Sequence, residues 1–402
     1  MNLKNTRILQ LGKFFPPDLG GIESVMFDIV RGLLKRKIAC DVLCSNSMAR
    51  YKEDIFDYDL RESSANLRDI QGDSKDSHKI HAESSVDSNI DLPKIMRCAS
   101  FGKFASTAIA PQMIFKLRKI IANYDIIHIH LPDPTANLAL FLANHKGKKV
   151  IIHWHSDIVR QKFLLKLYTP LQNWLLKRAD FIIATTQKYA DFSPTLQRFA
   201  HKIVAIPIGI DSLQNGDLCE SSELRRAKKT IFALGRLVQY KGFEYLIESM
   251  RYLPDFRLFI AGSGVEMLHL QARIKDFHLE NRVTMLGKID ECEKIEHLNN
   301  DSIFALPSIT RNEAFGVVQL EAMSCKMPVV ACEIEGSGVS FVNADNESGL
   351  NVSPRDSKAI AEAIKRVMQD YERFSEGAYH RYKAHFTREK MIDKIIDLYG
   401  RI

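Results

Sequence analysis

Apolar and polar positions along the chain follow a repeated pattern, in which short β-branched runs alternate with stretches of helical periodicity. Near-continuous apolar runs are typical of strands covered on both faces, and their alternation with helices predicts parallel α/β units. The first predicted strand leads through a loop with Pro16 and Pro17 into a helix predicted at 22–36. The strands predicted in the first half of the chain are 7–12, 38–44, 126–130, 149–153, 181–185 and 202–206.

The pattern stops near Pro207 and begins again at residue 230. The intervening residues 212–229 are polar, which predicts a linker between two domains. A length of 402 residues also exceeds what one hydrophobic core usually serves. Two successive α/β halves predict a ligand at the carboxyl edges of their strands. The second half is predicted to contain strands 230–234, 257–261, 282–286, 302–306 and 329–331, and helices 242–251, 265–277 and 315–325.

Residues 51–91 break the pattern, because they are polar, rich in Ser and Asp, and without sustained periodicity. This composition predicts a disordered or loosely held surface insertion. Charge is also uneven along the chain. Residues 50–93 contain six Lys/Arg and eleven Asp/Glu, whereas residues 94–180 contain fourteen and four. The basic stretch fits either an anionic membrane surface or a solvated face that serves only solubility.

The composition also bears on the compartment. No apolar run approaches the ~20 residues of a membrane span, and the apolar stretch before Pro16 is too short for the core of a signal peptide. The seven cysteines include no C-x-x-C pair, which fits free thiols in a reducing compartment. We therefore expect a cytoplasmic protein.

A loop suited to a diphosphate follows the predicted strand 230–234 and reads GRLVQYKG. Its first glycine permits a tight turn, and Arg236 and Lys241 place two cations on a loop that opens a helix. A solvated basic loop is the alternative interpretation.

A second glycine motif, Gly262-Ser263-Gly264, follows the next predicted strand. A G-x-G there either brings backbone amides close to a ligand or makes a plain tight turn. Met267 stands where a dinucleotide fingerprint has its third glycine, so NAD binding is not supported.

Two carboxylates, Glu313 and Glu321, stand eight residues apart in the segment EAFGVVQLE. If both were helical, they would lie about 12 Å apart along the axis, too far for an acid/base pair. They suit instead the two ends of one elongated ligand. The alternative is an ordinary acidic helix start and a solvated glutamate.

Taken together, the motifs resemble glycosyltransferase family 4, whose members are retaining enzymes of the GT-B fold. The likeness extends over nearly the whole chain apart from the insertion, and the pairing of GRLVQYKG with E-x7-E is its most specific part. It implies an α/β protein with two Rossmann-like domains facing each other across a cleft. In chain order the motifs are Gly20-Gly21, HWHSD with His155, GRLVQYKG, GSG, and the E-x7-E from Glu313 to Glu321.

The same resemblance implies the division of the chain. Residues 1–208, with the polar insertion at about 51–91, would form the acceptor-binding domain. Residues 209–375 would bind the nucleotide sugar, and the helices of 376–402 would pack back on the N-terminal domain.

The resemblance further implies roles for single residues. Arg236 and Lys241 would hold the donor diphosphate and neutralise the leaving group, while Glu313 would contact the donor sugar and Glu321 the ribose. Gly20 and Gly21 would bring a loop against the phosphate or acceptor, and His155 would hydrogen-bond a sugar hydroxyl. No nucleophile, metal ligand or cofactor is assigned. The implied catalytic residues are His155, Arg236, Lys241 and Glu313. The implied donor-binding residues are Gly20, Gly21, Arg236, Lys241, Gly262, Gly264, Glu313, Ala314, Phe315, Gly316, Val317 and Glu321.

The donor and acceptor follow from resemblance to bacterial cell-surface polysaccharide enzymes, including those of lipopolysaccharide, through HWHSD and the stretch 336–339. It implies transfer of a hexose, mannose from GDP-mannose, to a saccharide acceptor that is lipid-linked. UDP-glucose, UDP-N-acetylglucosamine and dTDP-rhamnose stay open as donors. The amphipathic segment 160–178, which Pro170 is expected to kink or divide, favours docking on the inner face of the cytoplasmic membrane. A core helix with a solvated basic rim is the alternative. No nucleic-acid partner is expected.

A metal enzyme is one competing interpretation. Two predicted strands each carry two histidines at alternate positions, so each pair faces one side. Four imidazoles at neighbouring strand ends could bind zinc, but no set of carboxylates or cysteines completes the site. The pairs are His128 with His130 and His153 with His155, and a weaker pair is His78 with His81.

Two further alternatives stay open. A GT-A enzyme would hold its metal with a D-x-D, and Asp57-Tyr58-Asp59 has that form but lies in the insertion, away from any predicted strand. A non-catalytic, two-lobed sugar- or nucleotide-binding protein would need the cleft. It would not need both the diphosphate cations and His155.

Overall fold

The computed structural model describes residues 3–18, 20–46, 50–55, 92–104, 107–158, 162–214 and 220–402. Contacts within the chain divide it into two units. The first unit consists of Met1–Ala184, Thr195–Ile206 and Met391–Ile402, and the second of Thr185–Pro194 and Pro207–Lys390. Most of the predicted insertion, with Asp57, Asp59, His78 and His81, lies outside the described residues.

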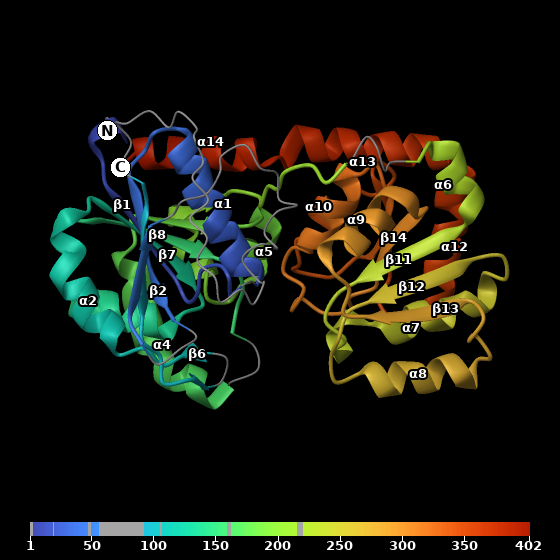
Figure 1. Cartoon of the computed structure of the whole chain (residues 1–402), viewed down its shortest axis with the longest axis horizontal. Coiled ribbons are helices and arrows are strands. Elements are labelled where there is room, and N and C mark those ends of the chain that lie inside the picture. The colour runs from blue at the N-terminus through green and yellow to red at the C-terminus, as the bar shows by residue number, and fades with distance from the viewer. Residues whose placement is uncertain are drawn as a thin grey trace, which may run out of the picture. The chain divides into compact units, whose positions relative to one another are not determined.

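The first unit is built on an eight-stranded sheet in the order β10-β9-β8-β7-β1-β2-β4-β3 (Figure 1). Neighbouring strands are parallel, apart from β3 and β4, which are antiparallel. The strands are β1 (Ile8–Leu11), β2 (Cys40–Ser45), β3 (Lys52–Ile55), β4 (Lys94–Cys98), β7 (Ile126–Leu131), β8 (Lys149–Trp154), β9 (Phe181–Ala184) and β10 (Ile203–Ala205). A separate antiparallel pair consists of β5 (Lys103–Phe104) and β6 (Thr107–Ala108).

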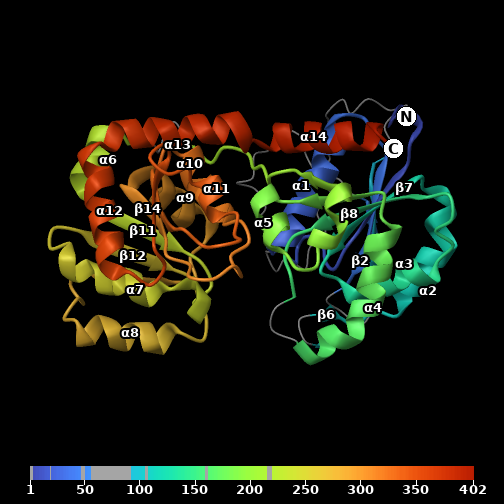
Figure 2. The same ribbon diagram turned by 180° about the vertical axis from the view of Figure 1, so that it is seen from behind.

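Helices cover both faces of this sheet (Figures 1 and 2). On one face α1 (Gly21–Lys35) contacts α14 (Arg388–Gly400), and a Cβ added to Gly32 would lie only 2.4 Å from Ile392 Cγ1. On the other face lie α2 (Gln112–Ile120), α3 (Pro134–Leu142) and α4 (Lys162–Arg178). The short 3₁₀ helices are η1 (Leu3–Asn5), η3 (Ile121–Asn123) and η4 (Gln197–Lys202).

The second unit contains a six-stranded, fully parallel sheet in the order β13-β12-β11-β14-β15-β16. Its strands are β11 (Thr230–Leu234), β12 (Arg257–Ala261), β13 (Val283–Gly287), β14 (Ile303–Leu306), β15 (Val329–Cys332) and β16 (Gly349–Val352). Its helices are α5 (Gln187–Phe192), α6 (Ser222–Lys228), η5 (Gln239–Lys241), α7 (Phe243–Ser249), η6 (Met250–Tyr252), α8 (Met267–Asp276), α9 (Glu291–Asn300), α10 (Val317–Ser324), α11 (Val339–Val342), α12 (Ser357–Gln369) and α13 (Tyr371–His385).

Side chains of the central strands alternate between two cores, as the pleat requires. On one face Ile231 and Ala233 pack into a buried cluster with α7, α8 and α12. On the opposite face Phe232 stacks on His297 of α9, with ring centroids 4.7 Å apart. Both faces are therefore apolar, which explains the continuous apolar runs in the sequence.

Three details differ from the sequence predictions. Residues 222–228 of the predicted linker form α6, because Ser221 Oγ caps the helix at Leu224 N and the buried Arg225 donates to the carbonyl oxygen of Cys325 over 2.7 Å. Of the two outcomes expected at Pro170, the structure excludes a division of α4, which is continuous from Lys162 to Arg178, and a kink stays a prediction. Residues 52–55 of the predicted insertion form β3 on the edge of the sheet.

The C-terminal tail is shared between the units. α13 belongs to the second unit, where Ser375 Oγ donates to the carbonyl oxygen of Lys326 over 2.6 Å. Gly377 also lies against the backbone of Glu347 there. Met391–Ile402 belongs to the first unit. Residues 376–390 of the tail therefore belong to the second unit and residues 391–402 to the first. The roles assigned to the two domains stay predictions. Among the described residues, no helix combines the length and apolar character needed to cross a bilayer.

Candidate active site

A buried ion pair lies at the carboxyl edge of the second sheet. Lys241 ends η5, just after β11, and its Nζ lies 2.5 Å from Oε2 of Glu313. Both side chains are about nine-tenths buried, with exposed fractions of 10% and 12%. Ser308 Oγ donates a second hydrogen bond to the same carboxylate oxygen over 3.0 Å. The predicted diphosphate cation and the predicted sugar-binding carboxylate are therefore in direct contact.

Glu313 itself lies in a turn rather than in a helix, so the axial spacing expected for two helical glutamates does not apply. The turn is held by the stretch Gly336–Val339. Ser337 Oγ donates to the carbonyl oxygen of Glu313, and Gly338 N donates to that of Ala314 over 2.8 Å. The turn leads through Phe315 to Gly316, whose φ of +78° favours glycine, and α10 begins at Val317.

The two glycine motifs of the second unit pack backbone to backbone. A Cβ at Gly262 would lie 1.8 Å from Gly235 O, and one at Gly264 would lie 2.2 Å from Leu237 O. The loops are joined by the bond from Leu237 N to Ser263 O, 2.9 Å long. Glycine is thus required at 262 and 264 by the close approach of the two loops, whatever ligand the loops bind.

Arg236 and Glu321 differ in how firmly they are held. Arg236 is exposed, and its guanidinium donates to Tyr240 Oη over 3.2 Å. Glu321 lies on α10 and accepts from Lys294 of α9 over 3.1 Å. Burial alone would lower the pKa of Lys294, but Glu321 and Glu291 outweigh it and raise that pKa to about 12. Lys294 is therefore charged and holds Glu321 in place.

In the first unit, Gly20 and Gly21 stand at the start of α1, and both are exposed. A Cβ at Gly21 would meet nothing within 4 Å, and one at Gly20 would meet only the side chain of Glu23. No packing of described residues requires glycine here, in contrast to Gly262 and Gly264. Open amides at the N-terminus of a 15-residue helix suit an anion.

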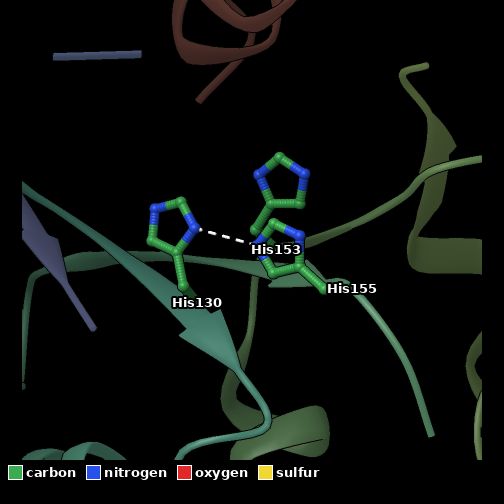
Figure 3. A group of neighbouring side chains, drawn as sticks. All are labelled: His130, His153 and His155. Atoms are coloured by element: carbon green, nitrogen blue, oxygen red, sulfur yellow. Dashed lines mark hydrogen bonds between the residues drawn. The ribbon is translucent and has the colours of Figure 1, made fainter. Parts of the chain in front are cut away.

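His155 follows β8 and belongs to a row of buried imidazoles (Figure 3). His130 of β7 is paired in register with His153 of β8, and His130 Nδ1 lies 3.0 Å from His155 Nε2. Burial lowers the pKa of His130 and His155 well below the usual value, and that of His153 to about 3. All three rings are therefore neutral at pH 7.

One ring nitrogen from each of His130, His153 and His155 lies within 4.8 Å of the other two. However, the three rings are stacked, with interplanar angles of 6° to 20°. The lone pair of an imidazole nitrogen lies in the ring plane, so in the face-to-face pair of His153 and His155 the lone pairs run side by side, whereas His130 Nδ1 and His155 Nε2 face each other across 3.0 Å. The row is held by ring stacking and by the hydrogen bond between His130 and His155.

Several residues that shape the site escaped the sequence analysis. Lys294, Ser308 and Ser337 each hold a predicted site glutamate, but none lies in a motif that marks it. Gln10 and Tyr399 are hydrogen-bonded to the histidine row from β1 and from the C-terminal helix. The one available signal was a polar glutamine within the apolar run of the first predicted strand.

Comparison with known proteins agrees with this architecture. The family model for glycosyl transferases group 1 matches residues 217–381, and that for Glycosyltransferase Family 4 matches residues 19–212. The O-antigen chain mannosyltransferase C of Escherichia coli is 29% identical over 98% of each chain. The D-rhamnosyltransferase WbpZ of Pseudomonas aeruginosa is 30% identical over 71% of this chain and 76% of its own.

Solved structures share the fold at lower identity. Sucrose-phosphate synthase from Thermosynechococcus elongatus superposes with a TM-score of 0.71 at 18% identity, covering 98% of each chain. Anabaena Alr3699/HepE in complex with UDP also gives 0.71, at 20% identity, covering 99% of this chain and all of that one. These neighbours are glycosyltransferase structures of the GT-B type, in agreement with the two α/β sheets of this chain. The chain therefore belongs to glycosyltransferase family 4, with the GT-B fold.

Proposed function

We propose that the protein is a retaining, metal-independent hexosyltransferase of cell-surface polysaccharide biosynthesis. The observation that carries the proposal is the buried pair of Lys241 and Glu313 at the mouth of β11, beside the exposed Arg236. Two cations on one loop neutralise the charge that develops on a leaving nucleoside diphosphate, a service that a divalent metal gives in other enzymes. Glu313 then contacts the sugar, aided by amides at the start of α10.

The remaining roles follow the family pattern. Glu321 binds the ribose, and Lys294 fixes the orientation of its carboxylate. In the first unit, Gly20 and Gly21 offer open amides to the phosphate or the acceptor, and His155 hydrogen-bonds a hydroxyl of the donor sugar. The base is contacted by backbone near β13, where Gly287 O already accepts from Gly262 N over 2.6 Å.

GDP-mannose is the donor that we favour. Support comes from the relatives, which include the O-antigen chain mannosyltransferase C and, at 25% identity over 67% of this chain, the phosphatidyl-myo-inositol mannosyltransferase of Mycobacterium leprae. The names of these relatives also favour an acceptor saccharide that is carried on a lipid. UDP-glucose, UDP-N-acetylglucosamine and dTDP-rhamnose are the competing donors.

A lipid-linked acceptor calls for contact between the enzyme and a membrane. The first unit exposes apolar side chains that suit such contact. Among the described residues, eight of the fourteen well-exposed large apolar side chains lie between residues 101 and 167. We call the part of this set on α2, α3 and α4 the apolar face; it consists of Phe115, Leu138, Phe141, Leu142, Leu164 and Leu167. The three helices lie side by side (Figure 2).

Basic side chains accompany the apolar face. Arg118 and Lys119 follow Phe115 by one helical turn, and Lys146, Lys166 and Lys177 are exposed on or beside α3 and α4. Not every cation of the basic stretch is available, because Arg178 donates to the carbonyl oxygens of His145 and Lys148. Exposed Leu and Phe beside Lys and Arg suit the interface of an anionic bilayer, where each cation is worth about 1 kcal/mol. We therefore infer peripheral docking on the inner face of the cytoplasmic membrane.

The catalytic proposal is tested with pure protein and four nucleotide sugars. Thermal shift ranks the donors, and release of nucleoside diphosphate with or without EDTA measures turnover. GDP-mannose should stabilise most, and EDTA should leave turnover unchanged. Stabilisation by uridine nucleotides alone would exclude the proposed donor. Loss of turnover in EDTA that Mn²⁺ restores would exclude metal independence. Binding without any turnover or transfer would indicate a non-catalytic binding protein.

The stereochemistry needs a product. Proton NMR of the linkage formed on a saccharide acceptor should show the anomeric configuration of the donor. An inverted linkage would contradict retention while leaving the donor assignment in place.

A further inference from the structure

A chain of buried hydrogen bonds leads from the C-terminal helix to His155 within the first unit. Gln10 Nε2 donates to Tyr399 Oη over 3.2 Å, and Gln10 Oε1 lies 2.9 Å from His130 Nε2. His130 Nδ1 in turn lies 3.0 Å from His155 Nε2. At the other end, Tyr399 Oη lies 2.6 Å from His128 Nδ1. All five side chains are buried.

The rings in this chain are neutral, so each has one N–H and one lone pair. The carbonyl oxygen of Gln10 can only accept, which places the proton of His130 on Nε2. His130 Nδ1 must then accept, so His155 donates from Nε2. Nδ1 of His155 makes no hydrogen bond to a described residue, and it is left with a lone pair.

The direction of the Gln10 amide therefore decides what His155 offers to a ligand. If the amide were reversed, its NH₂ would donate to His130 Nε2, and His130 would donate to His155 Nε2. The proton of His155 would then lie on Nδ1, and the ring would present a donor. In the direction described, Tyr399 Oη accepts from the amide NH₂. Reversal would place the amide oxygen opposite Tyr399, which would then have to donate to it and accept from Nδ1 of His128, so Tyr399 and His128 would have to change their roles as well.

We propose that Gln10 and His130 are positioning residues, which together with Tyr399 fix the tautomer of His155 so that its Nδ1 accepts a hydrogen bond from a hydroxyl of the donor sugar. The inference rests on the proposed function for the identity of the ligand, but the tautomer is a property of the free protein. In metal sites, the partners that orient a ligating imidazole change affinity or activity by about 10- to 100-fold when they are replaced. A comparable loss of kcat/KM is expected for Gln10→Met.

His153 provides the matched control. Its ring stacks on that of His155 with centroids 4.3 Å apart, yet neither of its nitrogens has a hydrogen-bond partner among the described residues. His153→Phe keeps an aromatic ring in the stack and leaves the hydrogen-bond chain intact. It should change neither the tautomer of His155 nor turnover.

The experiment is ¹⁵N NMR of the full-length protein labelled at histidine, with His155 assigned by the signals lost in His155→Gln. Wild type should show an unprotonated Nδ1 and a protonated Nε2 for His155. Gln10→Met should mix or reverse these states, and Tyr399→Phe, which frees the amide from the far end, should do the same if Gln10→Met fails to fold. His153→Phe should match wild type.

Each outcome bears on the proposal. A protonated Nδ1 in wild type, or an Nδ1 that stays unprotonated in both Gln10→Met and Tyr399→Phe, would overturn it. An equal response to His153→Phe would show that ring stacking and not the hydrogen-bond chain sets the tautomer. If the predicted tautomer changes appear while wild type turns over no nucleotide sugar, the positioning holds and the proposed function fails.

Discussion

Lys294 of α9 donates to Glu321 of α10 over 3.1 Å, and the same ammonium group lies 2.6 Å from Glu291. The exposed fractions of Lys294 and Glu321 are only 14% and 19%, so the contact is little screened by water. The carboxylate proposed to bind the ribose is thus oriented before any donor arrives. Pre-oriented contacts lower the entropy that a ligand loses on binding.

Replacing Lys294 by Met should therefore weaken donor binding more than catalysis. We expect KM for the donor to rise about tenfold with kcat nearly unchanged, because a ribose contact is equally strong in the ground state and the transition state. Steady-state kinetics measure both. Glu291→Gln leaves the pair with Glu321 intact and is the control. A fall in kcat with constant KM would contradict the ribose role.

Alanine variants of Arg236 and Lys241 should both lose turnover, but they should differ in the stability of the fold. Arg236 is exposed, so Arg236→Ala should lower kcat by about a hundredfold, some 3 kcal/mol of transition-state stabilisation, with little change in the unfolding temperature. Lys241→Ala should lower turnover equally and also destabilise the fold, by about 3 kcal/mol, because it leaves the carboxylate of Glu313 buried without its cation.

A double variant checks the cause of that destabilisation. Lys241→Met with Glu313→Leu removes both charges and should be more stable than Lys241→Ala, as measured by urea unfolding. If the double variant is less stable than Lys241→Ala, the buried pair is not what holds this loop. Full turnover in Arg236→Ala or in Lys241→Ala would exclude the diphosphate role of that residue.

The sequence predicted the alternation of strands and helices well, because strands such as β11 and β12 carry apolar residues on both faces, and both have the bounds predicted for them, 230–234 and 257–261. It also singled out the two motifs, GRLVQYKG and EAFGVVQLE, that contain Lys241 and Glu313. It did not predict their direct contact, since that depends on η5 and the turn before α10 meeting from positions 72 residues apart. The contacts of Gln10 with Tyr399 span 389 residues and leave no local pattern at all.

Replacement by alanine should have different effects on stability at Gly21 and at Gly262. Gly21→Ala places a methyl group in open space at the start of α1, so stability should stay constant or rise by up to about 1 kcal/mol. Turnover should nevertheless fall at least tenfold if the exposed amides approach a phosphate or the acceptor. Thermal unfolding and kinetics on one preparation test this. Full activity in a stable Gly21→Ala variant would exclude the ligand role.

Gly262→Ala is the contrasting case. Its Cβ would lie 1.8 Å from a backbone oxygen, and φ is +139°, so the variant should unfold at a lower temperature whether or not ligand is present. Unchanged stability in Gly262→Ala would mean that the two glycine loops are not packed as described.

Asp133 should make the stability of the protein depend on pH. Its Oδ1 caps α3 at Thr135 N and Ala136 N, whereas Oδ2 is buried without a hydrogen-bond partner among the described residues. Burial raises its pKa from 3.8 to about 6. The folded state therefore binds a proton more tightly than the unfolded state, and stability should fall as pH rises from about 4 to about 6.

Asp133→Asn keeps the capping oxygen and removes the charge. Relative to wild type, this variant should gain up to about 3 kcal/mol between pH 4 and pH 8, which corresponds to roughly two pKa units. Denaturant unfolding at both pH values measures the difference. Asp133→Ala, which loses the cap as well, should be less stable than Asp133→Asn at either pH by about 1 kcal/mol. A constant difference between wild type and Asp133→Asn would contradict the raised pKa.

Membrane docking can be tested with apolar side chains of α4 that are exposed at the surface. Leu167 is 69% exposed on α4 and Leu164 lies one turn before it, whereas Leu175 and Leu176 of the same helix are buried. The amphipathic stripe seen in the sequence is therefore divided, with its later part in the core and its earlier part at the surface. Only the earlier part is free to enter a bilayer.

Leu164→Gln with Leu167→Gln should lower binding to vesicles containing anionic lipid at least tenfold, because two leucines each lose the gain from burial in the interface. Lys166→Gln with Lys177→Gln should lower it by a similar factor, at about 1 kcal/mol per cation, and only at low salt. Leu268→Gln on α8 is the matched control, since Leu268 is 79% exposed but lies outside the apolar face. Co-sedimentation with anionic and neutral vesicles measures each variant. Equal binding of wild type to both vesicle types, or equal loss in Leu268→Gln, would leave the apolar face without a role at the membrane.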